Sequence, residues 1–110
     1  TSALVGRARA PSADVITRAG DRVNAGGVRL AMIVRNEEAI IERLIASTLP
    51  HIDSWRIIDT GSTDSTGARI EAALAGVPGE LRTREWVDFG HNRSELVEWA
   101  TEGADWLLLL

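Results

Sequence analysis

Short apolar runs alternate with segments of helical spacing over residues 28–110, and this alternation restricts the possible folds more than any other feature. The first run, Val28–Val34 (VRLAMIV), is almost continuously apolar, which is typical of a strand buried on both faces of a sheet. Ile40, Ile41, Leu44 and Ile45 then recur at helical spacing, and Pro50 ends the helix that they predict.

The same pattern is repeated twice along the chain. Strands are predicted over residues 55–58, 81–86 and 106–110, and helices over 65–75 and 92–102. The strand at 81–86 is charged enough to lie at a sheet edge. Strands that alternate with helices form right-handed βαβ units, so we predict a three-layer α/β fold with a parallel, Rossmann-like sheet.

Residues 1–27 lack this periodicity and end in the turn-forming segment Asn-Ala-Gly-Gly. We therefore divide the chain into a poorly structured lead-in, 1–27, with a short helix near 15–19, and one partial α/β domain, 28–110.

Composition excludes several functional classes. A net charge of −4 is too small to indicate nucleic acid or an acidic membrane face as a partner. The chain has no cysteine for a disulfide or a thiolate metal site, and no apolar run long enough to span a membrane. All 12 basic residues are arginine, which indicates a bacterium with a GC-rich genome, and we predict a cytoplasmic location.

Polar clusters follow the first two predicted strands, where parallel sheets bind ligands. Asn36 is suited to cap the first helix, and the loop DTGSTD begins at Asp59. Asp59 can accept hydrogen bonds from a base or a ribose, and Gly61 allows backbone to approach a ligand. Ser62 and Asp64 can cap a helix whose amino end attracts phosphate. The alternative, that these residues only satisfy a turn and a cap, stays open. Neither GxGxxG nor GxxxxGK[ST] occurs.

Four segments in this order resemble family 2 glycosyltransferases of the GT-A fold: LAMIVRNEEAIIERLIAS, WRIIDTGSTDSTGARI, WVDFGHNRSEL and ADWLLLL. The resemblance implies that the chain is the amino-terminal, nucleotide-binding half of an enzyme that transfers a sugar from a nucleotide-diphosphate donor to an acceptor that the sequence does not define. The residues that it assigns to the donor nucleotide are Arg35, Asn36, Glu37, Asp59, Thr60, Gly61, Ser62, Asp64 and Arg93.

Two of these positions carry qualifications. Thr60 stands where the family has a second acidic residue, although its hydroxyl can still bond to a base. Arg93 matches an arginine near the donor diphosphate, a role that suits a guanidinium. The alternative for Arg93 is a surface ion pair with Asp88 or Glu95.

The family also implies a divalent metal, Mg²⁺ or Mn²⁺, held by an acidic D-x-D motif that would begin after Leu110, where this sequence stops. We therefore expect no metal ligands up to Leu110, and we expect the fragment itself to be inactive. The runner-up hypothesis is a non-catalytic nucleotide-binding or interaction module. A third, a sugar-phosphate nucleotidyltransferase, would need a glycine-rich loop with Arg and Lys where RNEE stands.

Six further residues attract attention without indicating a site. His51 and His91 have no partner at metal-ligand spacing, which favours loop or surface roles. Four tryptophans could stack on carbohydrate, but their positions in the predicted elements favour core or rim roles for all of them: Trp55, Trp86, Trp99 and Trp106.

Overall fold

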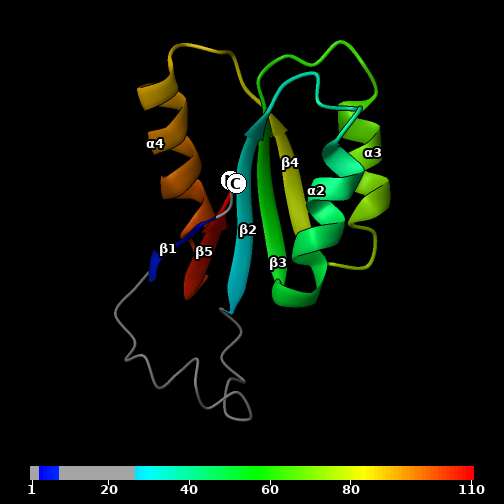
Figure 1. Ribbon diagram of the computed structural model, residues 1–110. Coiled ribbons are helices and arrows are strands. Elements are labelled where there is room, and N and C mark those ends of the chain that lie inside the picture. Colours follow the sequence, from blue (N-terminus) through cyan, green and yellow to red (C-terminus); the bar gives the residue numbers. More distant parts are fainter. Residues whose placement is uncertain (1–2, 8–26) are drawn as a thin grey trace.

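The computed structural model describes residues 3–7, as backbone, and residues 27–110. Its elements, in chain order, are β1 (Ala3–Arg7), β2 (Val28–Val34), α2 (Ile41–Thr48), the 3₁₀ turn η1 (Leu49–His51), β3 (Ser54–Asp59), α3 (Thr66–Ala73), β4 (Gly79–Thr83), α4 (Phe89–Ala100) and β5 (Trp106–Leu109) (Figure 1).

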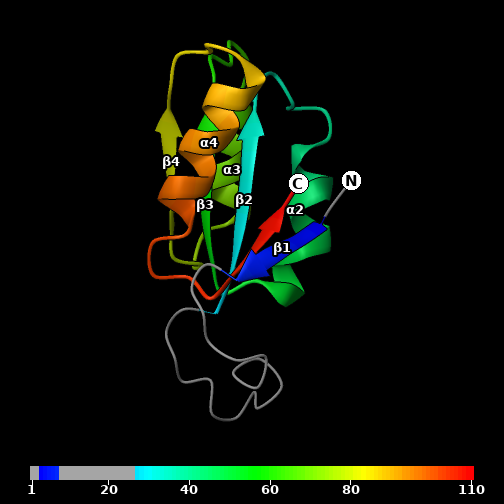
Figure 2. The same ribbon diagram turned by 90° about the vertical axis from the view of Figure 1, so that its left-hand side faces the viewer.

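The strands form one sheet in the order β1-β5-β2-β3-β4. The four strands from β2 to β5 run parallel, whereas β1 pairs antiparallel with β5 (Figure 2). This arrangement confirms an α/β fold with a four-strand parallel sheet, compatible with a Rossmann-like fold. The edge position predicted for the strand at 81–86 is also confirmed, because the corresponding strand, β4, lies at the edge of the sheet.

The sequence did not predict β1, which lies within the segment taken as a lead-in. The short helix predicted near residues 15–19 falls outside the described residues, so that prediction is not tested.

The last strand is one residue shorter than predicted, because the pairing of β5 with β2 ends where Leu109 faces Ala31. Leu110 therefore lies just beyond β5. Its backbone N–H still donates to the carbonyl of Ala31 at 3.2 Å, and its half-buried side chain packs against the core on the α2 and α3 side of the sheet. Leu110 thus continues the line of β5, between β1 and β2.

Helices cover both faces of the sheet, with α2 and α3 on one side and α4 on the other (Figure 1). Alternate residues of β2 face opposite sides of the sheet, so Leu30 and Met32 pack with α2 and α3 while Ala31 packs with α4. Ile41 and Ile45 of α2 are completely buried, and each contributes about 1.5–3 kcal/mol by leaving water.

The first helix, α2, begins later than a cap at Asn36 would place it. Backbone N–H groups of Ile40 and Ile41 both donate to the carbonyl of Glu37, at 3.0 and 2.9 Å, so a turn precedes α2. The N-cap position is Ile40, which has no side-chain cap, and Asn36 instead adopts a φ of 51°. Asn36 as the helix cap was therefore wrong.

The last helix, in contrast, begins earlier than predicted. Asp88 is its N-cap and accepts a hydrogen bond from the backbone N–H of His91 at 2.7 Å. The cap fixes the start of α4 at Phe89, at the same end of the sheet as the loops that follow β2 and β3 (Figure 1).

The order of the strands reverses beside β2. The chain passes from β2 to β3 and β4 in one direction and then returns to place β5 on the other side of β2. Open parallel sheets bind ligands outside the carboxyl ends of strands at such a reversal. None of the described helices is both long and apolar enough to cross a membrane.

Candidate functional site

The loops that follow β2 and β3 are joined by hydrogen bonds that use residues predicted to bind a nucleotide. The backbone N–H of Asn36 donates to Oγ of Ser62 at 2.8 Å. In return, Oδ1 of Asn36 accepts a hydrogen bond from the backbone N–H of Thr63, also at 2.8 Å. Asn36 and Ser62 therefore hold the two loops together, and the left-handed backbone of Asn36 suits a short polar residue.

A second group of contacts lies next to this one. The backbone N–H of Glu37 donates to Oγ1 of Thr66 at 2.8 Å, and the backbone N–H of Ser65 donates to Oε1 of Glu38 at 3.0 Å. Oδ1 of Asp64 accepts from the backbone N–H of Thr66 at 2.9 Å. Hydrogen bonds from the Thr66 and Ser65 side chains lower the pKa of Asp64 and of Glu38, respectively.

The side chain of Asp59 stabilises the turn that begins the loop after β3. This side chain is buried, and Oδ1 accepts from the backbone N–H groups of Gly61 at 2.9 Å and Ser62 at 2.7 Å. Gly61 has a φ of 115°, a conformation that side chains disfavour. The geometry is thus that of the turn alternative, and Ser62 does not cap α3. Whether Asp59, Gly61, Ser62 and Asp64 also contact a nucleotide stays a prediction.

A cavity of about 310 Å³ lies at the carboxyl end of β2, beside the strand reversal. The residues that line it are Ile33, Val34, Arg35, Glu37, Thr60 and Trp86. Three of them, Arg35, Glu37 and Thr60, are among the predicted site residues. In the described part of the chain, the Arg35 side chain makes no hydrogen bond or ion pair, so its donors are available.

Trp86 was not predicted to belong to this site. Its side chain is 46% exposed and lines the cavity, unlike Trp55 and Trp99, which are both 5% exposed in the core. The core roles of Trp55 and Trp99 agree with the prediction. The signal for Trp86 was its place at the end of a predicted edge strand, where fewer neighbouring residues are available to cover a tryptophan.

Asn92 fixes the backbone on both sides of Trp86. It is completely buried in α4, accepts a hydrogen bond from the backbone N–H of Val87 at 2.9 Å and donates to the carbonyl of Glu85 at 3.1 Å. Trp86 lies between these two anchored residues. Asn92 is therefore a positioning residue for the indole, and no sequence pattern had marked it.

Arg93 does not line the cavity. Its guanidinium lies 5.9 Å from the ring centroid of Phe89. The alternative of an ion pair with Asp88 or Glu95 was wrong, because Asp88 caps α4 and Glu95 pairs with Arg84 at 2.8 Å. Contact of Arg93 with a diphosphate stays a prediction.

The described residues offer no site for the divalent metal that the family resemblance implies. Among residues 27–110, no group of three or more His, Asp or Glu side chains could hold an ion. His51 and His91 are both exposed, in η1 and in the first turn of α4. The acidic motif was expected only after Leu110, so neither that motif nor the requirement for a metal is tested, and no chemical step is derived through a metal.

No protein-family model matches the chain. Over 84 residues it is 37% identical to a TPR repeat-containing protein of Synechococcus elongatus. The match covers 76% of this chain and 19% of that protein, so the chain spans about a fifth of the relative's length.

This likeness contradicts the predicted activity. The relative is described by its repeats and not as a transferase, and the comparison therefore favours a non-enzymatic module over part of a glycosyltransferase. The predictions of sugar transfer, of an enzyme and of the transferase class are corrected accordingly. The runner-up hypothesis, a non-catalytic nucleotide-binding or interaction module, agrees better with the finding.

Proposed function

We propose that this chain is a non-catalytic nucleotide-binding module, with its site in the cavity at the carboxyl end of β2. The observation that carries the proposal is the exposed indole of Trp86 in the same cavity as Arg35, which has no side-chain partner among the described residues. A flat aromatic face and a free guanidinium match the two ends of a nucleoside diphosphate, its base and its phosphates.

Each lining residue has a role in this proposal. Trp86 offers a stacking surface, and stacking of a base on an aromatic side chain is worth about 1–3 kcal/mol. The hydroxyl of Thr60, whose present hydrogen bond to the Val34 carbonyl is long at 3.3 Å, can turn toward a base. Arg35 supplies charge-assisted hydrogen bonds to phosphate. Glu37 can accept a hydrogen bond from a ribose hydroxyl.

The hydrogen bonds between the two loops support the same proposal. Because Asn36, Ser62 and Asp64 connect the loops, the cavity wall is ordered before a ligand arrives. A preformed wall reduces the entropy lost on binding. On this proposal, the likeness to family 2 glycosyltransferases concerns the GT-A layout and its nucleotide end, and not sugar transfer.

The module would work within a longer protein. The described elements alternate strand and helix, so they are not the tandem helix pairs that make up TPR repeats. We propose that the module accompanies such repeats, which bind partners on extended concave surfaces. The cytoplasmic location predicted from composition belongs to this proposal.

The test is a titration of UDP and GDP into the chain, followed by tryptophan fluorescence. The proposal expects saturable quenching that Trp86→Leu removes, with affinity by calorimetry reduced about tenfold or more. Phe89→Leu is the matched control, because Phe89, the first residue of α4, is an aromatic residue that is 62% exposed but does not line the cavity. A folded chain that binds neither nucleotide, or a Trp86→Leu variant with unchanged affinity, would refute the proposal.

A further inference from the structure

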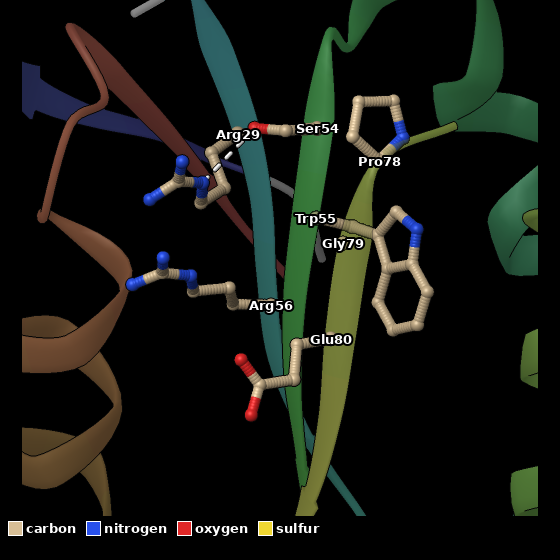
Figure 3. A pocket seen from close by; sticks show the side chains of 7 residues that line it. All are labelled: Arg29, Ser54, Trp55, Arg56, Pro78, Gly79 and Glu80. Carbon is tan, nitrogen blue, oxygen red and sulfur yellow. Dashed lines mark hydrogen bonds between the residues drawn. The ribbon is translucent and has the colours of Figure 1, made fainter.

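A second cavity, of about 210 Å³, lies at the amino end of β3 and β4, at the opposite end of the sheet from the site above. Arg29 of β2 and Arg56 of β3 both line it. Figure 3 shows their guanidinium groups extended side by side toward the same face of the sheet, whereas the indole of Trp55 lies on the other face. Two arginines thus present their charges to one small space.

Arg29 is held firmly but keeps one nitrogen available. It is 9% exposed, and Nε donates to Oγ of Ser54 at 2.9 Å. Nη1 donates to the carbonyls of Ala100 and Glu102, at 2.8 and 2.5 Å, at the carboxyl end of α4. Within the described part of the chain, Nη2 donates no hydrogen bond.

Arg56 repeats this arrangement one strand away. Nη1 donates to the carbonyl of Trp99 at 2.6 Å and to Oε1 of Glu102 at 3.0 Å. Its guanidinium lies 5.2 Å from the ring centroid of Trp99. Among the described residues, no acceptor bonds to its Nε or Nη2. The end of α4, where the helix dipole is negative, therefore fixes both arginines through one nitrogen each.

The positive charge in this cavity is incompletely balanced. Burial, and then the neighbouring Arg56, lower the pKa of Arg29, while Glu102 opposes them. Glu80 also lines the cavity, but its carboxylate pairs with Arg82 at 3.1 Å. Among the residues that the structure describes, these two arginines share one carboxylate, that of Glu102, which leaves a local excess of positive charge that a bound anion would relieve.

We propose that this cavity binds a small oxyanion, a carboxylate or a phosphate group, through those N–H groups of Arg29 and Arg56 that have no acceptor among the described residues. Guanidinium groups bind such anions through two parallel hydrogen bonds, and two adjacent guanidiniums favour them further. The Ser54 hydroxyl accepts from Arg29 and can donate its own hydrogen to the same anion. The site is independent of the nucleotide cavity.

The test follows backbone amide resonances of the ¹⁵N-labelled chain during titration with sodium phosphate and, separately, sodium acetate, at constant ionic strength adjusted with chloride. We expect saturable shifts at Ser54, Arg56 and Gly79 with at least one of the two anions, and none with chloride alone. A preference for phosphate would identify a phosphate group as the ligand, and a preference for acetate an acidic side chain. No saturable shift with either anion would overturn the proposal.

Three variants separate a specific site from general charge attraction. Arg56→Gln should weaken binding about tenfold, the effect of losing one charge-assisted hydrogen bond. Glu80→Gln should strengthen it severalfold by removing a negative charge from the cavity lining. Arg69→Gln, in α3 on the other face, should leave binding unchanged. Equal weakening by Arg56→Gln and Arg69→Gln would contradict the proposal, and so would a Glu80→Gln variant that binds no tighter.

Discussion

Replacement of Asn92 by alanine should both destabilise the fold and weaken the proposed nucleotide site. The Asn92 side chain is completely buried and makes two hydrogen bonds, to the Val87 N–H and the Glu85 carbonyl. Alanine leaves both backbone groups without a partner. Each unsatisfied group costs about 1–3 kcal/mol when buried, and these two are partly buried, so we expect a loss of about 2–4 kcal/mol in the free energy of unfolding.

The assay is urea unfolding followed by far-ultraviolet circular dichroism, with the matched variant Ser94→Ala, an exposed position of α4, as the control. The control should change the unfolding free energy by less than about 0.5 kcal/mol. In addition, Asn92→Ala should reduce nucleotide affinity at temperatures where the variant is still folded, because the backbone on either side of Trp86 is released. A loss of stability below about 0.5 kcal/mol would mean that Asn92 does not anchor this connection.

Three further predictions follow from the same structure. Ile45→Ala, at a completely buried position of α2, should cost about 2–5 kcal/mol in urea unfolding, and a cost below about 1 kcal/mol would mean that the helix is loosely packed. Gly61→Ala should cost about 1–2 kcal/mol because φ is 115°, although the added Cβ meets no atom within 4 Å; Gly67→Ala, inside α3, is the control and should not show this loss. The pKa values of Asp64 and Glu38 are lowered on folding. The stability that the two carboxylates contribute is therefore complete above their usual pKa values of 3.8 and 4.5, and it is lost as the pH falls through their folded pKa values. Unfolding midpoints measured between about pH 7 and pH 3 should therefore fall at the acid end, and the fall should be smaller in the Asp64→Asn, Glu38→Gln double variant. An identical fall in both proteins would mean that Asp64 and Glu38 do not cause the loss of stability in acid.

The alternation of strands and helices could be predicted because it depends on local patterns. The run Val28–Val34 matches β2 from end to end, since a strand buried on both faces must be apolar throughout. The bounds of β4 were less accurate. Pairing with β3 sets its register from Gly79 to Thr83, and no local pattern carries that information. The same reason explains why β1 was missed, because its pairing with β5 joins opposite ends of the chain.

The candidate site was predictable in place but not in detail. Chain order and strand ends led to Arg35, Glu37 and Thr60, all of which line the cavity. The roles of the loop residues after β2 and β3 could not be read from spacing, because a side chain that holds a loop and one that holds a ligand have the same composition. The roles of Trp86 and Asn92 at the site depend on how α4 packs against the sheet, and no periodicity in the sequence reveals that packing. The predicted enzyme rested on resemblance alone, and the comparison with a repeat-containing protein contradicted it.

Nucleotide binding in the cavity at the carboxyl end of β2 is tested most directly by a map of amide shifts in the ¹⁵N-labelled chain on addition of UDP or GDP. A nucleotide in this cavity should cause saturable shifts for residues 33–37, for Thr60 and for the indole N–H of Trp86, which line the cavity or adjoin it. Shifts confined to Ser54 and Gly79, at the amino end of the sheet, or no shifts in a folded chain, would contradict a nucleotide site in that cavity.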